Sequence, residues 1–91
     1  MDNAEIVAVF RDIATLLEKK KENWFKIRAY RKAADSIERL TVPLEQMVSE
    51  GRLKEIPGVG EAITKKITEL VTTGNLEYYQ RLKAELREGT G

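Results

Sequence analysis

Hydrophobic residues recur every three or four positions along almost the whole chain, the spacing that places them on one face of an α-helix. No stretch alternates with the period of two that marks a β-strand. The stripes predict helices over residues 4–20, 26–40, 43–50, 61–73 and 76–87. A chain of 91 residues has room for one modest core. We therefore expect an all-α fold, a compact bundle of four to five short helices forming a single domain over residues 1–91.

Residues that start and stop helices stand between these stripes. Asp2 and Glu5 are spaced as a capping box for the first helix. Pro43 suits the first turn of the third helix, because proline needs no amide partner there. Gly74 favours a left-handed end to the fourth helix, and Asn75 can cap the fifth. The helices are short, so packing between them must supply most of their stability.

Charge is concentrated in one segment of the chain. Residues 19–32 hold seven basic residues and one acid, a local charge of +6, whereas the whole chain has a net charge of +1. Trp24 and Phe25 lie in this segment, at the end of a polar link between the first two helices. Such a basic pole attracts phosphate groups. The alternative is a lysine-rich helix end that is simply solvated.

The segment Ile56-Pro57-Gly58-Val59-Gly60 carries the most specific signal in the chain. Pro57 fixes one backbone angle, and Gly58 and Gly60 permit conformations that side chains forbid. Because these glycines have no side chain, the amides of Gly58, Val59 and Gly60 can approach a phosphate closely. They stand where the next helix begins, and the N–H groups and dipole of a helix N-terminus favour an anion. We expect Val59 to anchor the turn by pointing inward.

This segment resembles the hairpin of the helix-hairpin-helix motif, which has the form apolar-Pro-Gly-apolar-Gly. In that family the hairpin binds the DNA backbone without reading bases. The resemblance also implies a sodium or potassium ion, shared between the phosphate and the backbone carbonyls of Ile56 and Val59; no other cofactor is required. The alternative is a plain glycine-rich turn. A match at five positions, followed by the apolar pair Ile63 and Ile67, favours the motif.

A second segment, residues 25–34, is similar to the second helix of the N-terminal domain of family X DNA polymerases, the DNA polymerase beta group. The match to bacterial and archaeal members is closest in the run Ile27-Arg28-Ala29-Tyr30-Arg31-Lys32-Ala33-Ala34. Thr73-Gly74-Asn75-Leu76 also matches the family's Thr-Gly-x-Leu turn, so the resemblance covers residues 4–88. It implies a compact helical domain that binds single-stranded template DNA and, at a gap, the 5′-phosphate.

The basic segment, the hairpin and the resemblance together indicate which side chains contact DNA. The basic candidates, from the charged segment and from the surroundings of the hairpin, are Lys26, Arg31, Lys32, Lys54 and Lys65. The matching tyrosine of the family places its hydroxyl near the phosphate, which makes Tyr30 a further candidate. Equally, Tyr30 is a core aromatic of the second helix. Phosphate contacts of this kind give salt-dependent binding with little base preference.

In the beta-type enzymes the same domain removes a 5′-deoxyribose phosphate through a lysine that forms a Schiff base, and this lysine matches Lys66. Lys65 has Glu61 and Glu69 one turn away on either side and is expected to form ion pairs. Lys66 instead has Ala62 and Leu70 at these positions, so we expect it to be partly desolvated, with other cations nearby. Both effects lower the pKa of an amine and make it a better nucleophile.

The chain departs from the beta-type enzymes at several supporting positions. Ala62 and Tyr78 stand in place of lysines, Phe25 replaces a histidine that stacks on the DNA end, and Lys65 stands in place of an acid. These departures leave open whether the chain is an enzyme. A sequence-independent DNA-binding module is the leading hypothesis, a Schiff-base lyase acting through Lys66 is the second, and a protein-interaction adaptor is the third.

Absent residue types narrow the function further. The chain has no cysteine or histidine, which excludes disulfides and thiolate chemistry and disfavours a zinc site. No apolar run approaches the roughly 20 residues that span a membrane. No carboxylate cluster for the two metals of nucleotidyl transfer is apparent. We expect a cytoplasmic protein, nucleoid-associated in a prokaryote, that binds DNA and no membrane, either free-standing or continuing covalently into a polymerase catalytic domain.

Overall fold

The structure is a computed structural model that describes residues 1–90, with side chains described to residue 87. Its elements in chain order are α1 (Asn3–Lys19), α2 (Trp24–Glu38), α3 (Leu44–Ser49), the 3₁₀ turn η1 (Leu53–Glu55), α4 (Glu61–Thr73) and α5 (Glu77–Thr90). This part of the chain contains no strand. The predicted all-α class is therefore confirmed, and α4 has the predicted bounds. Gly91 lies outside the described residues.

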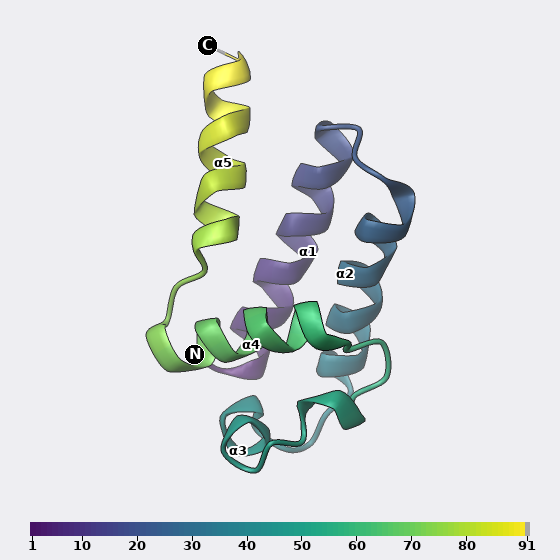
Figure 1. Cartoon of the computed structure of the whole chain (residues 1–91), viewed down its shortest axis with the longest axis vertical. Coiled ribbons are helices and arrows are strands. Elements are labelled where there is room, and N and C mark those ends of the chain that lie inside the picture. Colours follow the sequence, from purple (N-terminus) through teal and green to yellow (C-terminus); the bar gives the residue numbers. More distant parts are fainter. Residues whose placement is uncertain (91) are drawn as a thin grey trace.

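The helices α1 and α2 pack side by side as an antiparallel pair, and the remaining elements surround this pair (Figure 1). In this view α4 runs across the pair, α3 lies beyond one end of it, and α5 extends alongside α1. One apolar core joins all five helices, with Ile13, Ile37, Leu44, Ile67 and Leu82 as a member from each. No polar or charged side chain is fully buried among the described residues.

The N-terminus of α1 is capped within its own first turn. The Asp2 carboxylate accepts the Glu5 N–H at 2.8 Å, and the Glu5 carboxylate accepts the Asp2 N–H at 3.1 Å, as the capping-box spacing predicts. Asn3 then ties this end of α1 to α3. Its side chain accepts the Leu44 N–H at 2.8 Å and donates to the Val42 carbonyl at 3.0 Å.

The helix α2 begins two residues earlier than predicted. Asn23 accepts the Phe25 N–H at 2.8 Å, so Trp24 and Phe25 form the first turn of the helix and not the end of a linker. Asn23 is hard to recognise as a cap from the sequence, because the apolar stripe becomes clear only from Ile27 onward. The third helix is shorter than predicted, because Pro43 precedes its first turn.

The predicted cap of α5 is wrong. The helix begins at Glu77, whose N–H donates at 2.9 Å to the carboxylate of Glu69 on α4. Asn75 instead accepts a hydrogen bond from the side chain of Gln80 at 3.1 Å. A cap supplied by a different helix leaves no local spacing to recognise. The left-handed end of α4 is confirmed, since Gly74 has a φ of 75°.

Candidate nucleic-acid interface

The hairpin between η1 and α4 begins with a tight turn. The Val59 N–H donates to the Ile56 carbonyl at 3.0 Å, and Gly58 has a φ of 84°. Proline followed by a glycine with positive φ is typical of a type II turn. The side chains of Ile56 and Val59 are buried, so the turn is anchored as predicted. One expectation is wrong, because the Val59 amide closes the turn and cannot also donate to a phosphate.

The start of α4 has unpaired amides. Gly60 is the N-cap and supplies no capping side chain. Within residues 1–90 no acceptor pairs with the N–H groups of Gly58, Gly60, Glu61, Ala62 and Ile63. The backbone of Gly60 is extended, with a φ of −96°, and an added Cβ meets no atom within 4 Å. Only Gly58 therefore needs glycine for its conformation, contrary to the expectation for both; Gly60 leaves the amides uncovered.

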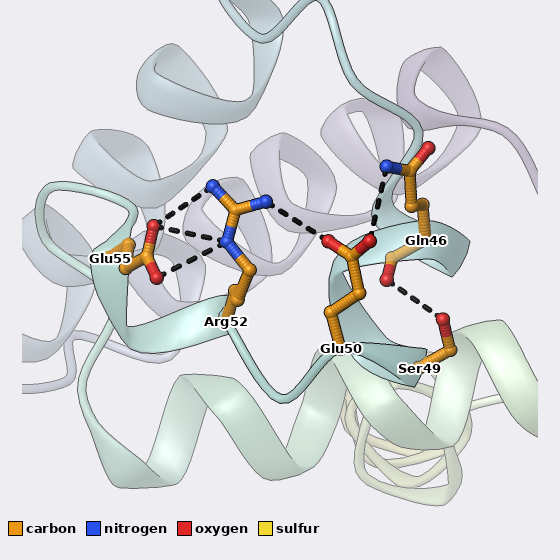
Figure 2. A network of polar contacts seen from close by, with 5 residues as sticks. All are labelled: Gln46, Ser49, Glu50, Arg52 and Glu55. Carbon is orange, nitrogen blue, oxygen red and sulfur yellow. Dashed lines mark hydrogen bonds and ion pairs between the residues drawn. The ribbon is translucent and has the colours of Figure 1, made fainter.

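A polar network holds the connection that leads into the hairpin. Figure 2 shows Arg52 between two carboxylates, donating to Glu50 at 3.0 Å and to Glu55 at 3.1 Å. Gln46 of α3 donates to the second oxygen of Glu50 at 3.3 Å. Hydrogen bonds from Arg52 to Glu55 and then to Glu50 raise the pKa of its guanidinium. Arg52 thereby links Glu50, which ends α3, to Glu55 of η1, although exposed ion pairs of this kind add little to global stability.

The basic segment divides between different sides of α2. Lys32 lies against the hairpin, since a Cβ added to Gly58 would stand 2.9 Å from the Lys32 Cγ. Arg31 turns towards α1 and forms an ion pair with Glu18. The guanidinium carbon of Arg31 also lies 6.0 Å from the centre of the Trp24 ring. Lys32, and not its neighbour Arg31, therefore brings positive charge to the hairpin.

A second group of cations lies where α2, α4 and α5 meet. The Nζ atoms of Lys26 and Lys66 stand 5.6 and 4.9 Å from the centre of the Tyr78 ring. This ring stacks on Tyr30, with 6.2 Å between centres and 13° between planes. Burial, and after it the charge of Lys26, lowers the pKa of Lys66, while Glu69 opposes the change. The desolvation predicted for Lys66 is thus present.

Comparison with known proteins identifies this arrangement. A family model described as a helix-hairpin-helix domain matches residues 1–76. The chain belongs to the helix-hairpin-helix domain family. It is also similar to the DNA polymerase/3′-5′ exonuclease PolX of Bacillus subtilis (strain 168), with 29% identity over 89 residues. That alignment covers 98% of this chain but 15% of the relative, so the chain spans a small part of the relative's length. The resemblance to family X polymerases is confirmed, and both comparisons support DNA binding.

The other candidate residues of this helix-hairpin-helix domain have varied positions. Lys54 on η1 and Lys65 on α4 are exposed. Among residues 1–90, Lys65 forms no ion pair with Glu61 or Glu69, contrary to expectation. Tyr30 is 3% exposed, and burial raises the pKa of its hydroxyl. Of the two interpretations of Tyr30, the core aromatic is therefore the one the structure supports.

The carbonyls of Ile56 and Val59, expected to share a monovalent cation, both keep an acceptor site. The Ile56 oxygen accepts only the Val59 N–H, and the Val59 oxygen has no hydrogen bond in the described chain. Sodium or potassium binding stays a prediction. Residues 1–90 contain no cluster of three or more histidine, cysteine, aspartate or glutamate side chains placed to hold a metal ion. No helix in the same range combines the length and apolarity needed to cross a membrane.

Two features of this surface escaped the sequence analysis. Trp24 and Phe25 are 56% and 78% exposed beside Lys26, so large aromatic side chains are exposed within the basic segment of the domain. Their position outside any apolar stripe is the signal that could have revealed this exposure. In the sequence, Tyr78 stands out only as a departure from the family pattern. Its contacts join three helices, and no spacing along the chain encodes them.

Proposed function

We propose that this domain binds the DNA backbone without reading bases, at gaps or at 5′-phosphate ends. The observation that carries the proposal is the uncapped start of α4, where Gly60 leaves the backbone amides uncovered. The stem of the Lys32 side chain packs against the nearby Gly58. Backbone amides and lysine ammonium groups bind phosphate oxygens but carry no sequence information. Membership of the helix-hairpin-helix family and similarity to a DNA polymerase support the same function.

The preference for 5′-phosphate ends is supported by the second group of cations. A terminal phosphate monoester carries more negative charge than a bridging phosphodiester. The paired ammonium groups of Lys26 and Lys66 therefore favour an end over a continuous strand. We propose that the domain serves a repair polymerase in the cytoplasm, holding the downstream side of a gap for a catalytic domain to which it is covalently joined.

Fluorescence anisotropy on gapped DNA, with and without the 5′-phosphate, tests this function across a salt series. We expect affinity to fall steeply with salt and to be higher for the phosphorylated gap. Gly60→Ala should weaken binding to both DNAs, because it adds a methyl group at the residue where a phosphate would approach the unpaired amides. The same change should lower the unfolding free energy by less than about 1 kcal/mol, because alanine caps a helix less well than glycine but the new Cβ meets no other protein atom within 4 Å.

Neighbouring residues provide a matched control for the role of charge. Lys32→Gln should weaken binding and reduce the salt dependence. Arg31→Gln removes the same charge from a side chain paired with Glu18, so we expect a smaller effect. Equal losses would contradict the assignment of Lys32 to the hairpin site. Equal affinities with and without 5′-phosphate would limit the function to general backbone binding, and no binding at low salt would favour a protein-interaction adaptor.

The environment of Lys66 supports a second candidate function, removal of a 5′-deoxyribose phosphate. The neutral Nζ of Lys66 attacks the sugar aldehyde and expels water to give a Schiff base. Loss of a C2′ proton then breaks the bond between C3′ and oxygen, so that the DNA strand leaves with a 5′-phosphate. Water hydrolyses the remaining Schiff base, which releases the sugar phosphate and restores the lysine. Because burial and Lys26 lower the pKa of Lys66, its amine is neutral at lower pH than an ordinary lysine. Borohydride should then trap an adduct that Lys66→Ala abolishes and Lys65→Ala retains. Binding without trapping leaves the domain as a DNA-binding module alone.

A further inference from the structure

Two like charges share one aromatic ring at the junction of α2, α4 and α5. The ammonium groups of Lys26 and Lys66 lie 5.6 and 4.9 Å from the centre of the Tyr78 ring, although they come from different helices. Among residues 1–90 neither lysine forms an ion pair. The acid that acts on Lys66, Glu69, is already engaged by the Glu77 N–H. Repulsion between two flexible, unpaired ammonium groups should separate them unless another group attracts both.

The Tyr78 ring has the properties needed to attract both groups. The face of an aromatic ring is electronegative and draws a cation within about 6 Å of its centre. The position of the ring is fixed, because it stacks on Tyr30, which is itself buried in the core. The Tyr78 hydroxyl is buried and accepts no hydrogen bond from Lys26 or Lys66. The ring and not the hydroxyl therefore makes the contacts with the lysines.

We infer that Tyr78 is a positioning residue whose ring holds the ammonium groups of Lys26 and Lys66 together, so that one terminal phosphate can bridge them. The identity of that ligand rests on the proposed function, whereas the pairing of the two lysines does not. Holding both groups before DNA arrives removes part of the ordering cost of binding. An uncharged ring does this without adding a third positive charge to the site.

The pairing is testable in the protein without DNA. Lys26→Gln removes a positive charge near Lys66 and should raise the pKa of Lys66 by roughly half a pH unit, followed by NMR of its side-chain nitrogen. Lys65 and Glu69 of α4, the other charges that act on Lys66, stay unchanged in every variant. Lys26→Gln is then combined with each replacement of Tyr78. It should raise the pKa of Lys66 by the same amount in the Tyr78→Phe background, which keeps the ring, and by half that amount or less in the Tyr78→Leu background. An equal rise in Tyr78→Leu would overturn the inference.

A second replacement covers the outcome in which Tyr78→Leu fails to fold. A pentafluorophenyl ring at position 78 keeps the shape of an aromatic side chain but reverses the charge on its face. We expect it to reduce the influence of Lys26 on Lys66 as strongly as Tyr78→Leu. An undiminished influence with the fluorinated ring overturns the role of the ring face.

The DNA readout separates this inference from the proposed function. The affinity advantage of 5′-phosphorylated over unphosphorylated gapped DNA should fall several-fold in Tyr78→Leu and persist in Tyr78→Phe. An advantage that persists in Tyr78→Leu overturns the positioning role at the phosphate. If the unmodified chain shows no such advantage, the proposed end binding fails, and the pKa measurement alone decides whether Tyr78 pairs the lysines.

Discussion

The N-termini of α1 and α4 solve the same problem in opposite ways. Both begin with amides that have no partner inside the helix. At α1, the side chains of Asp2 and Glu5 close a capping box. At α4, the cap is Gly60, and within residues 1–90 no side chain accepts from the first turn. Carboxylates of its own first turn pair with the free amides of α1, whereas the first amides of α4 remain open to an anion from outside the chain.

On the proposed function, this difference separates a helix start that serves stability from one that serves binding. A capping side chain contributes about 1 kcal/mol to a helix. The start of α4 forgoes part of that contribution, although buried Ile56 and Val59 hold the hairpin firmly. The ion pairs of Arg52 with Glu50 and Glu55 span the bend that leads into it. A phosphate site requires uncovered amides that are held in one orientation. A flexible loop would leave the same amides unpaired, but it would not hold them pointing towards the phosphate.

Gly58→Ala should have the largest effect on stability and on DNA affinity, because it disturbs the tight turn that precedes the uncapped start of α4. An L-residue at a φ of 84° costs about 1–2 kcal/mol, and the new methyl group also displaces the stem of Lys32. We expect a loss of this size in urea denaturation, together with a large loss of DNA affinity. Gly51→Ala is the matched control, since Gly51 has a φ of 66° and open space around it. Comparable affinity losses in both variants would show that binding merely follows stability.

Exchanging the two kinds of cap should have the next largest effect. Gly60→Asp gives α4 a carboxylate cap, which should stabilise the fold by a few tenths of a kcal/mol, a gain of about the size that separates Asp from Gly at this position. Its carboxylate occupies the amides that DNA needs, so affinity should fall about tenfold or more. Asp2→Ala should do the reverse, lowering the unfolding free energy by about 1 kcal/mol and leaving affinity unchanged. Tight DNA binding by Gly60→Asp would show that these amides are not the site.

The local features of both helix starts could be predicted from sequence. The capping box of α1 and the bounds of α4 follow from residues a few positions apart. The pairing of the Val59 amide was also within reach, because a proline-glycine turn commonly bonds its first and fourth residues. The different roles of Arg31 and Lys32 were not, since adjacent residues of equal charge differ only in which neighbour packs beside them.

Long-range features of the site lay beyond sequence reasoning. The cap of α5 comes from Glu69 on another helix. The lowered pKa of Lys66 could be predicted in direction from residues on its own helix. The part of that change due to Lys26 could not, because it depends on how α2 lies beside α4 in the fold. Tyr78 gathers both lysines only because α5 returns to the same junction. The sequence thus shows what the hairpin is, and the fold determines which charges meet it.

Glu61→Gln offers the smallest and most specific test of the open helix start. Glu61 is the first residue of α4, and its carboxylate is the one acidic group in that turn. A negative charge there stabilises the helix through its interaction with the helix dipole, but it repels a phosphate that approaches the same amides. Its removal should therefore lower the unfolding free energy by about 0.3–1 kcal/mol and strengthen DNA binding about two- to fivefold at low salt. The gain in affinity should fade as salt screens the charge. Unchanged or weaker binding at low salt would mean that the phosphate does not approach the N-terminus of α4, whatever the other variants show.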